Sequence, residues 1–240
     1  MAKKSAKKRT RGDKTRFRPV RWLRRWLYRL VLFLVILIGV AVVTYRVINP
    51  PVTYYMLQEK WRLGALDRQW VPLEGVAPVM ARSVVAAEDA NFCQHWGFDM
   101  SAIRDAIADG GNRGASTLSQ QVVKNVYLWH GRSWPRKALE AAITPLVEAV
   151  WPKRRIIEVY LNVAEFDEGV FGVEAAARHY FGVGPEALTP VQAARLAAVL
   201  PNPKERNAAR PSSWLRKRAG GIMDGAASIR RDGRAARGED

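Results

Sequence analysis

A stretch of 16 uncharged residues near the N-terminus, Leu30 to Tyr45, constrains this chain more than any other feature of its sequence. Residues 26–29 extend it to about 20 residues, which is enough to cross a lipid bilayer as a helix. The aromatic residues Trp22 and Tyr28 lie beside it, where membrane proteins place their interfacial anchors. We therefore expect one transmembrane helix at residues 27–46.

Positive charge precedes this apolar stretch. Residues 1–29 hold 13 Lys and Arg side chains and a single acidic one, Asp13. Because basic flanks stay on the cytoplasmic side, we expect residues 1–26 in the cytoplasm and the rest of the chain outside. A cleaved signal peptide is the alternative, since it also joins a basic region to an apolar one. The long basic region, the long apolar run and the absence of a small-residue cleavage site in TYRVINPP favour a retained anchor.

The net charge of +17 suggests a nucleic-acid-binding protein until the charges are located. Residues 204–240 hold 10 basic and 5 acidic side chains, whereas residues 30–203 hold 16 of each. A nucleic-acid-binding groove needs a basic excess on the folded body, so this composition argues against nucleic acid as a partner. The single cysteine, Cys93, excludes an intramolecular disulfide, so the fold must hold by packing.

Helical patterns fill the chain after the apolar stretch, and no β-strand alternation of useful length is present. We expect an all-α domain at residues 50–223. Residues 224–240 are rich in Gly, Ala and Arg and are expected to form a disordered basic tail. The expected helices include Thr53–Trp70, 78–91, Met100–Asp109, 151–162, 170–182 and Thr189–Leu200.

The stretch VVAAEDANFCQHWGFD carries the most informative polar residues. An apolar run leads into two adjacent acids, Glu88 and Asp89, at the expected end of a helix that starts at Pro78. Burial and the negative end of the helix dipole would both raise the pKa of a carboxyl group there towards that of a general base. Phe92 and His95 follow within two helical turns. The alternative is a helix end that exposes two solvated acids.

A second polar stretch, GASTLSQQVVKN, predicts a helix that is capped by Ser116 or Thr117. Gln120 and Lys124 share one face of this helix, and Thr117 and Gln121 share a neighbouring face. These hydroxyl, amide and ammonium groups can all donate hydrogen bonds to an anion. A solvated polar face is the alternative interpretation.

The stretch GRSWPRKALEAA follows, and its Pro135 suits the first turn of a helix. Arg136 and Glu140 have the i,i+4 spacing of an ordinary ion pair, which contributes little on a surface. Arg132, together with Lys124, would add cations near any phosphate group that is bound there.

Five motifs in this order, EDANFCQHWG, GASTLSQQVVKN, RKALE, KRRIIEVYLN and GVEAAARHYFG, resemble the peptidoglycan glycosyltransferases of family 51. The resemblance covers about residues 50–203. The phrases YLWHGRSW and AEFDEGVFGVEAAA, the anchor and the lack of room for a transpeptidase domain make the chain most similar to the monofunctional proteobacterial members. It departs from the family pattern at Val183, where a basic residue is usual, and in a short loop before GASTLS. Both departures concern the handling of acceptor or chain rather than the chemistry.

The resemblance implies a lysozyme-like, all-α glycosyltransferase domain in the periplasm, anchored to the bacterial inner membrane by a single pass. The implied reaction polymerises lipid II into β-1,4-linked strands, with inversion at C1 of MurNAc and release of undecaprenyl pyrophosphate. Glu88 would be the general base, and Glu140, the second family glutamate, would orient cations or a divalent ion at the pyrophosphate. The implied substrate-binding residues are Ser116, Thr117, Gln120, Gln121, Lys124, Asn125, Arg132, Arg136 and Lys137, and the supporting residues are Asp89, Phe92 and His95.

The implied partners are lipid II, the growing lipid-linked glycan chain and the membrane, with cell-wall synthesis or division proteins as further candidates. No cofactor is implied with certainty, and Mg²⁺ or Mn²⁺ near Glu140 stays open. A lytic transglycosylase or lysozyme-type hydrolase would share the fold, yet has no need for the Gln-Gln-x-x-Lys-Asn and Arg-Lys-x-x-Glu groups. A non-catalytic scaffold would be expected to lose Glu88 or Lys124, and both are present.

Overall fold

The computed structural model describes residues 19–110, 114–131 and 133–232 of the chain. Contacts divide the chain into two compact units, Met1–Val40 and Ala41–Asp240, and each is described by itself. Helices account for most of the described residues, so the expectation of an all-α fold is confirmed.

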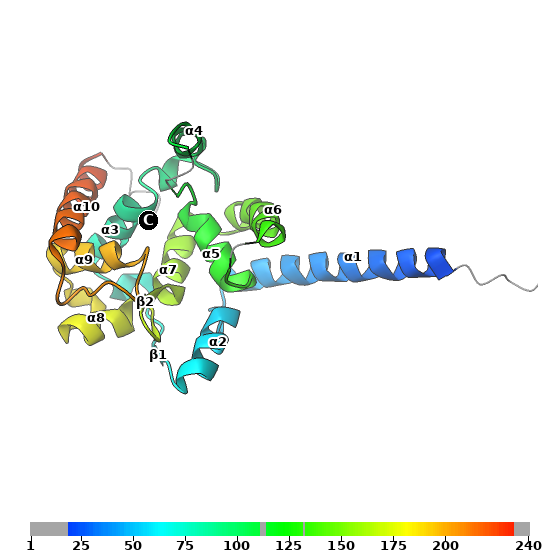
Figure 1. Ribbon diagram of the computed structural model, residues 1–240, viewed down its shortest axis with the longest axis horizontal. Helices are drawn as coiled ribbons and strands as arrows, with labels where there is room; N and C mark the ends of the chain where they lie inside the picture. Colours follow the sequence, from blue (N-terminus) through cyan, green and yellow to red (C-terminus); the bar gives the residue numbers. More distant parts are fainter. Residues whose placement is uncertain (1–18, 111–113, 132, 233–240) are drawn as a thin grey trace, which may run out of the picture. The chain divides into compact units, whose positions relative to one another are not determined.

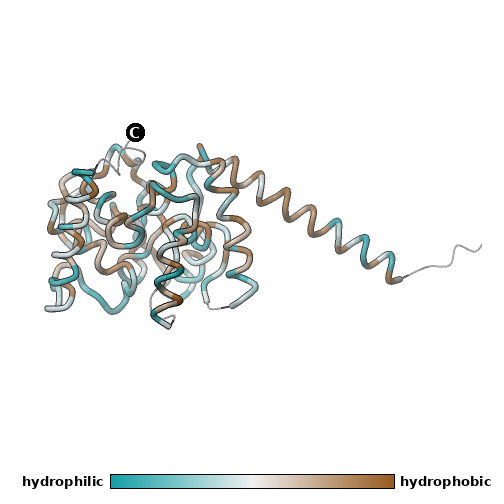
Figure 2. Tube along the Cα trace, turned by 90° about the horizontal axis from the view of Figure 1, so that it is seen from above, coloured by the Kyte–Doolittle hydropathy of each residue, from teal (hydrophilic) through white to brown (hydrophobic). Residues whose placement is uncertain are grey.

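The first unit contains most of helix α1 (Pro19–Tyr45). The segment Val20–Tyr45 is apolar and long enough to cross a membrane. At about 1.5 Å per residue it rises roughly 39 Å, against roughly 30 Å of bilayer hydrocarbon. Figure 2 shows hydrophobic residues along most of this helix and hydrophilic ones towards its N-terminal end. Helix α1 therefore fits a single-pass membrane anchor, and it begins earlier than the sequence predicted.

Helices also form most of the second unit (Figure 1). Several of them start at a hydroxyl residue that accepts a hydrogen bond from the first turn: Thr53, Thr117, Thr189 and Ser212. Such caps satisfy backbone groups that helix geometry leaves unpaired. The helices are α2 (Tyr54–Leu63), α3 (Pro78–Glu88), α4 (Met100–Ala108), α5 (Leu118–Tyr127), α6 (Trp134–Val150), α7 (Lys153–Val163), α8 (Val173–Phe181), α9 (Pro190–Val199) and α10 (Ser213–Arg231), with 3₁₀ turns at Leu73–Gly75, Phe92–Gln94 and Pro185–Ala187.

The core is built around α7, which is buried along almost its whole length. Ile156 and Leu161 are completely inaccessible to solvent, and Tyr160 is nearly so. Burying a side chain of this size contributes about 1.5–3 kcal/mol. Helix α5 packs against both α6 and α7, while α3 packs against α9 and α10. The two polar motifs lie at the end of α3 and in the first turns of α5, and hydrogen bonds from Leu118 to Asp89 and from Gln121 to Glu88 join them.

The start of α5 is fixed by a capping box, and Thr117 rather than Ser116 is the capping residue. Thr117 Oγ1 accepts a hydrogen bond of 3.3 Å from the Gln120 backbone, and Gln120 Oε1 accepts one of 3.1 Å from the Thr117 backbone. Thr117 Oγ1 also donates to the carbonyl of Gly97 at 2.7 Å. Gly97 has φ of 84°, and a Cβ there would lie 2.6 Å from Thr144 Cγ2, so only glycine lets this loop pass.

A small sheet, which the sequence did not reveal, joins distant parts of the second unit. Its strand order is β1 (Asp67–Arg68), β3 (Val170–Phe171) and β2 (Glu165–Asp167). Strands β1 and β3 are parallel, and β2 and β3 are antiparallel. Strands of two or three residues are too short to show the period-2 alternation by which strands are recognised.

Helix α2 is shorter than the expected helix Thr53–Trp70. It ends at Leu63 because Gly64, with φ of 82°, terminates it, and the Gly64 N–H donates to the Lys60 carbonyl at 2.8 Å. Glycine at this position ends helices readily because a left-handed turn costs it little. The chain then enters β1.

Helix α10 corrects the expected beginning of the tail at residue 224. The helix continues through Arg231, because Ile222, Ala226 and Ile229 recur at helical spacing and are buried. These residues supply the apolar face that the Gly, Ala and Arg composition obscured. Residues 233–240, the rest of the expected tail, lie outside the described residues.

Candidate active site

Helix α3 ends at Glu88, near the end that the apolar run predicted and three residues before the bound of the expected helix 78–91. Glu88 Oε2 accepts a hydrogen bond of 3.0 Å from Gln121 Nε2, whereas Oε1 is buried and has no hydrogen-bond partner among the described residues. Burial raises the pKa of the Glu88 carboxyl group, while the Gln121 hydrogen bond and the charges of Arg218, Lys124 and Arg206 act in the opposite direction. A desolvated carboxylate with an unused lone pair is suited to accept a proton.

Gln121 is held towards Glu88 by Tyr160. The Tyr160 hydroxyl donates to Gln121 Oε1 at 3.3 Å, so the Gln121 amide presents its Nε2 to the carboxylate. Burial, and then the charge of Glu88, raises the pKa of the Tyr160 hydroxyl well above its ordinary value, so this group stays a donor. Gln121, which was expected to line the donor site, therefore also fixes the position of Glu88.

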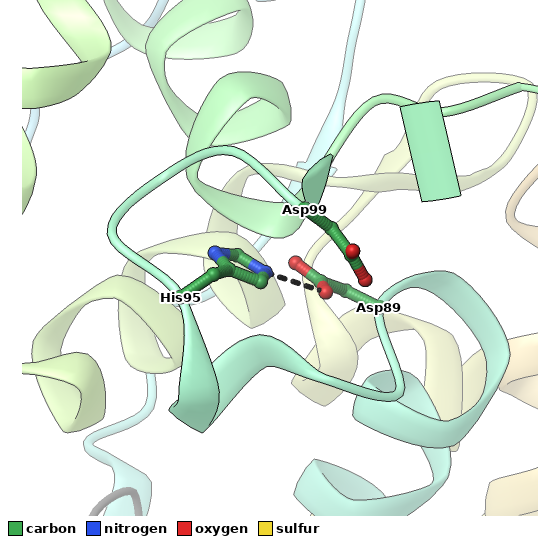
Figure 3. A group of neighbouring side chains, drawn as sticks. All are labelled: Asp89, His95 and Asp99. Atoms are coloured by element: carbon green, nitrogen blue, oxygen red, sulfur yellow. Dashed lines mark hydrogen bonds and ion pairs between the residues drawn. The ribbon is translucent and has the colours of Figure 1, made fainter. Parts of the chain in front are cut away.

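Asp89 joins the end of α3 to the start of α5. Its Oδ1 atom lies 2.8 Å from His95 Nε2, as Figure 3 shows, and its Oδ2 atom accepts a hydrogen bond of 3.0 Å from the Leu118 backbone. Phe92 is fully buried and meets the His95 ring edge-on, with 6.2 Å between the ring centroids. These side chains hold the loop after α3 against α5, directly beside Glu88.

Asp89, His95 and Asp99 offer ligand atoms within 4.8 Å of one another, a spacing that can hold a metal ion (Figure 3). Asp99, however, caps α4, and its Oδ1 atom accepts hydrogen bonds from the Ser101 backbone and hydroxyl. Its Oδ2 atom accepts one of 2.9 Å from Asn91 Nδ2. The Ser101 hydroxyl and the other donors lower the pKa of Asp99 to about 2. Because these carboxylate oxygens already receive donors, we interpret the group as a structural brace.

The second glutamate, Glu140, lies on α6 and is only 2% exposed. Arg136 Nη1 lies 2.8 Å from Glu140 Oε2, and the Lys137 ammonium group contacts Glu140 Oε1. Lys137 Nζ also donates to Ser116 Oγ at 3.0 Å. The pair of Arg136 and Glu140 is therefore buried, unlike the surface pair that its spacing had suggested. Both Glu140 oxygens are engaged by cations.

A divalent ion at Glu140, which the sequence analysis left open, does not fit this arrangement. A metal ion needs several oxygen ligands that are not already neutralised. Here the two oxygens of the one buried carboxylate face a guanidinium and an ammonium group. The cluster with metal-ligand spacing in the described part of the chain lies at Asp89, His95 and Asp99 instead.

Lys124, on α5, interacts electrostatically with both glutamates. Burial lowers the pKa of its ammonium group, whereas the charges of Glu140 and Glu88 raise it, and Arg136 and Lys137 lower it further. Among the residues that the structure describes, no carboxylate lies in direct contact with Lys124. A partly buried cation without a direct counter-ion is a favourable position for a bound anion.

Two cavities adjoin at the hydrogen bond between Glu88 and Gln121. Gln121 lines the first, of about 280 Å³, and Glu88 lines the second, of about 290 Å³. The first is also lined by Tyr55, Lys124, Asn125, His130, Tyr160, Glu165 and Lys204. The second is also lined by Asp89, Asn91, Asp99, Ser116 and Thr117. Glu88 therefore lines one cavity, and Lys124 lines the other.

The remaining predicted residues fall into three groups. Asn125 lines the first cavity, where its Oδ1 atom lies 3.2 Å from His130 Nε2. Thr117 Oγ1 and Gln120 Oε1 form the capping box of α5, and a contact of either residue with substrate stays a prediction. Arg132 lies outside the described residues, and its role stays a prediction.

Sequence reasoning missed two cations that act on Glu88, namely Arg206 in the loop after α9 and Arg218 on α10. Arg218 Nη2 lies 3.5 Å from the carbonyl of Ala87, which immediately precedes Glu88. A tryptophan four residues before Arg218, Trp214, was the available signal, because the two share a helix face and the guanidinium lies 5.9 Å from the ring centroid. Nothing in the sequence connects that face to α3.

A desolvated carboxylate beside cations is suited to general-base catalysis with an anionic leaving group. Comparison with known proteins agrees, since the family model described as transglycosylase matches residues 57–226. The chain belongs to this transglycosylase family, which confirms the expected family and enzyme class.

Curated relatives extend the similarity along nearly the whole chain. A biosynthetic peptidoglycan transglycosylase of Jannaschia sp. (strain CCS1) is 60% identical over 98% of both chains. Proteins with the same description from Stutzerimonas stutzeri (strain A1501) and Caulobacter vibrioides (strain ATCC 19089 / CIP 103742 / CB 15) are 48% and 46% identical. These two matches cover 82% and 90% of this chain, and 85% and 97% of the relatives.

Proposed function

We propose that this chain polymerises lipid II into β-1,4-linked glycan strands of bacterial peptidoglycan and releases undecaprenyl pyrophosphate. Membership of the transglycosylase family supports the reaction class, and the descriptions of the relatives support peptidoglycan as the product. One observation carries the proposal: a desolvated oxygen of Glu88 lies in the field of Lys124, and neither group has a direct partner of its own among the residues that the structure describes. Transfer from a lipid pyrophosphate needs both a base for the attacking hydroxyl group and positive charge for the leaving group.

Glu88 is the general base of this mechanism. The 4-hydroxyl group of the acceptor GlcNAc gives its proton to the Glu88 carboxylate while its oxygen forms a bond to C1 of the donor MurNAc. The bond from C1 to the pyrophosphate oxygen breaks on the opposite face, so the α-linked donor becomes a β-1,4 product. Gln121 keeps the carboxylate in place, and Tyr160 keeps the Gln121 amide in place.

Cations stabilise the pyrophosphate as it leaves. Lys124 contributes an ammonium group that has no direct counter-ion within residues 19–110, 114–131 and 133–232. Arg136 and Lys137 contribute two further positive charges. Glu140 orients these two side chains, because each of its carboxylate oxygens pairs with one of them. Glu140 therefore orients cations and takes no proton. Arg132 is proposed to add another cation, on the basis of its place in the motif alone.

The anchor gives the enzyme access to a substrate that diffuses in the plane of a membrane. We place α1 in the inner membrane, the basic residues 1–26 in the cytoplasm and residues 50–223 in the periplasm. The apolar length of α1 and the 13 basic side chains in residues 1–29 support this orientation. Tethering raises the effective concentration of a membrane-bound substrate at the site.

The test is to incubate the detergent-solubilised protein with labelled lipid II and to separate the products on a gel. A ladder of lysozyme-sensitive glycan is the expected result. Shortening of pre-made glycan strands without a ladder would replace the proposal with a lytic activity. Neither signal would indicate a non-catalytic scaffold.

A further inference from the structure

A third cavity, the α10 groove, opens beside the end of α3 and has a volume of about 520 Å³. It is lined by Ala86 and Ala87 of α3 and by Trp214, Lys217, Arg218, Gly221 and Ile222 of α10. Ala86 and Ala87 also line the cavity that contains Glu88. The α10 groove therefore adjoins the catalytic carboxylate across a single turn of helix, and the mechanism described above does not use it.

The α10 groove combines an aromatic ring with positive charge. Trp214 is 52% exposed. The guanidinium group of Arg206 lies 4.5 Å from the Trp214 ring centroid, and that of Arg218 lies 5.9 Å from it. Lys217 is exposed at the rim. Among the described residues, none of these three cations forms an ion pair, although Arg206 and Arg218 each donate a hydrogen bond to a backbone carbonyl.

The floor of the α10 groove is kept open by glycine. Gly221 lies in the interior of α10, where glycine is a poor helix former. A Cβ added there would have nothing within 4 Å, so no close packing requires the glycine. Arg218 offers an unused hydrogen-bond donor beside this floor, because its Nε atom is buried and has no hydrogen-bond partner in the described structure.

An exposed indole ring stacks on the apolar face of a sugar, and paired cations bind carboxylates. The acceptor sugar must place its 4-hydroxyl group at Glu88, and the muramic acid linked to that sugar carries a peptide with several carboxylates. We propose that the α10 groove binds this acidic peptide branch of the acceptor, with Trp214 against the sugar and Lys217 and Arg218 on the carboxylates. This inference rests on the proposed function and adds a specificity site to it.

The test compares two substrates and four variants. The substrates are lipid II with its acidic peptide and an analogue in which the peptide carboxylates are converted to primary amides. The variants are Lys217→Gln and Trp214→Ala at the rim, Gly221→Leu to fill the floor, and Arg230→Gln as a control at the far end of the same helix. Arg218 is left unchanged because it also acts on Glu88.

The expected result is that Lys217→Gln raises the KM for acidic lipid II about tenfold, because the variant loses one charge-assisted hydrogen bond to the substrate. The amidated analogue should have the raised KM already with the wild-type enzyme, and Lys217→Gln should not raise it further. Trp214→Ala and Gly221→Leu should raise KM for both substrates, and Arg230→Gln should change neither.

Equal KM values for the two substrates with wild-type enzyme and with Lys217→Gln would overturn the inference. It would also be overturned if Lys217→Gln left KM in detergent unchanged but weakened binding to phosphatidylglycerol vesicles, because the α10 groove would then face a lipid surface. Absence of polymer from both substrates with the wild-type enzyme is a different result, which would remove the proposed function itself and this inference with it.

Discussion

The two glutamates of this protein, Glu88 at the end of α3 and Glu140 within α6, are both withdrawn from water but have opposite surroundings. Glu140 has a cation on each oxygen. Glu88 has a neutral amide on one oxygen, no hydrogen-bond partner on the other within the described part of the chain, and positive charges only at a distance. The comparison teaches that burial alone does not identify a base. A carboxylate with both oxygens paired holds a structure, whereas one left incompletely satisfied is available for chemistry.

The largest expected effect is on the chemical step when Glu88 is replaced. Glu88→Gln keeps the shape and the hydrogen-bonding partner but cannot accept the proton, so kcat for lipid II polymerisation should fall by about 10²–10⁴-fold. Thermal unfolding in the same detergent should be unchanged, because no ion pair is broken. A kcat near that of the wild type, with unchanged melting, would show that the base lies elsewhere.

Glu140→Gln should produce the opposite pattern, a loss of stability as well as of activity. Removing one partner of a buried ion pair leaves the other charge uncompensated, which costs about 3 kcal/mol in the free energy of unfolding. The Lys137 side chain is 41% exposed, so most of this cost comes from Arg136. Denaturant unfolding measures the change.

The matched control for Glu140→Gln is Glu74→Gln. Glu74 also pairs with an arginine, Arg154, but its side chain is 67% exposed. That substitution should cost less than about 1 kcal/mol. Equal costs for the two variants would mean that Glu140 is not the buried clamp described here.

Lys124→Ala tests the stabilisation of the leaving group without changing the group that accepts the proton. Without the ammonium group, kcat/KM for the donor should fall by about 10–100-fold, since a charge-assisted hydrogen bond is worth about 1.5–3 kcal/mol. Lys60→Ala, an exposed lysine on α2, is the control and should have no effect. Lys124→Ala with an unchanged kcat/KM would exclude this cation from the donor site.

Arg218→Gln tests the distant charges on Glu88. The Arg218 charge lowers the pKa of Glu88, so its removal should raise that pKa. A general base works only when it is deprotonated. In a plot of kcat against pH, measured at saturating lipid II, the acid limb should therefore move to higher pH. Arg230→Gln should leave the limb in place. Movement to lower pH would contradict the electrostatic account of Glu88.

The membrane anchor, the helical class and the polar motifs could be predicted from sequence, because each depends on a local pattern. The 16 uncharged residues define the anchor, and the capping box of Thr117 and Gln120 can be recognised within four residues. The end of α3 at Glu88 follows from the apolar run before it. Local spacing also identified Arg136 and Glu140 as an i,i+4 pair.

Contacts between distant segments could not be predicted in the same way. The spacing of Arg136 and Glu140 carries no information about burial, which depends on how α6 packs. Arg218 reaches the end of α3 only because α10 packs there. The small sheet was missed because pairing between β1 and β3, not the strand sequences, creates it. Tertiary contact decides these features, and a single sequence does not record it.

The most direct test of the central claim is chemical rescue of Glu88→Ala by formate, a small carboxylate that can occupy the space of the lost side chain. The measured quantity is the rate of lipid II polymerisation as the formate concentration is raised. The account predicts a very low rate without formate, a rate that rises with formate in Glu88→Ala, and no such rise in the wild type or in Lys124→Ala. Polymerisation by Glu88→Ala at the wild-type rate before any formate is added would contradict it.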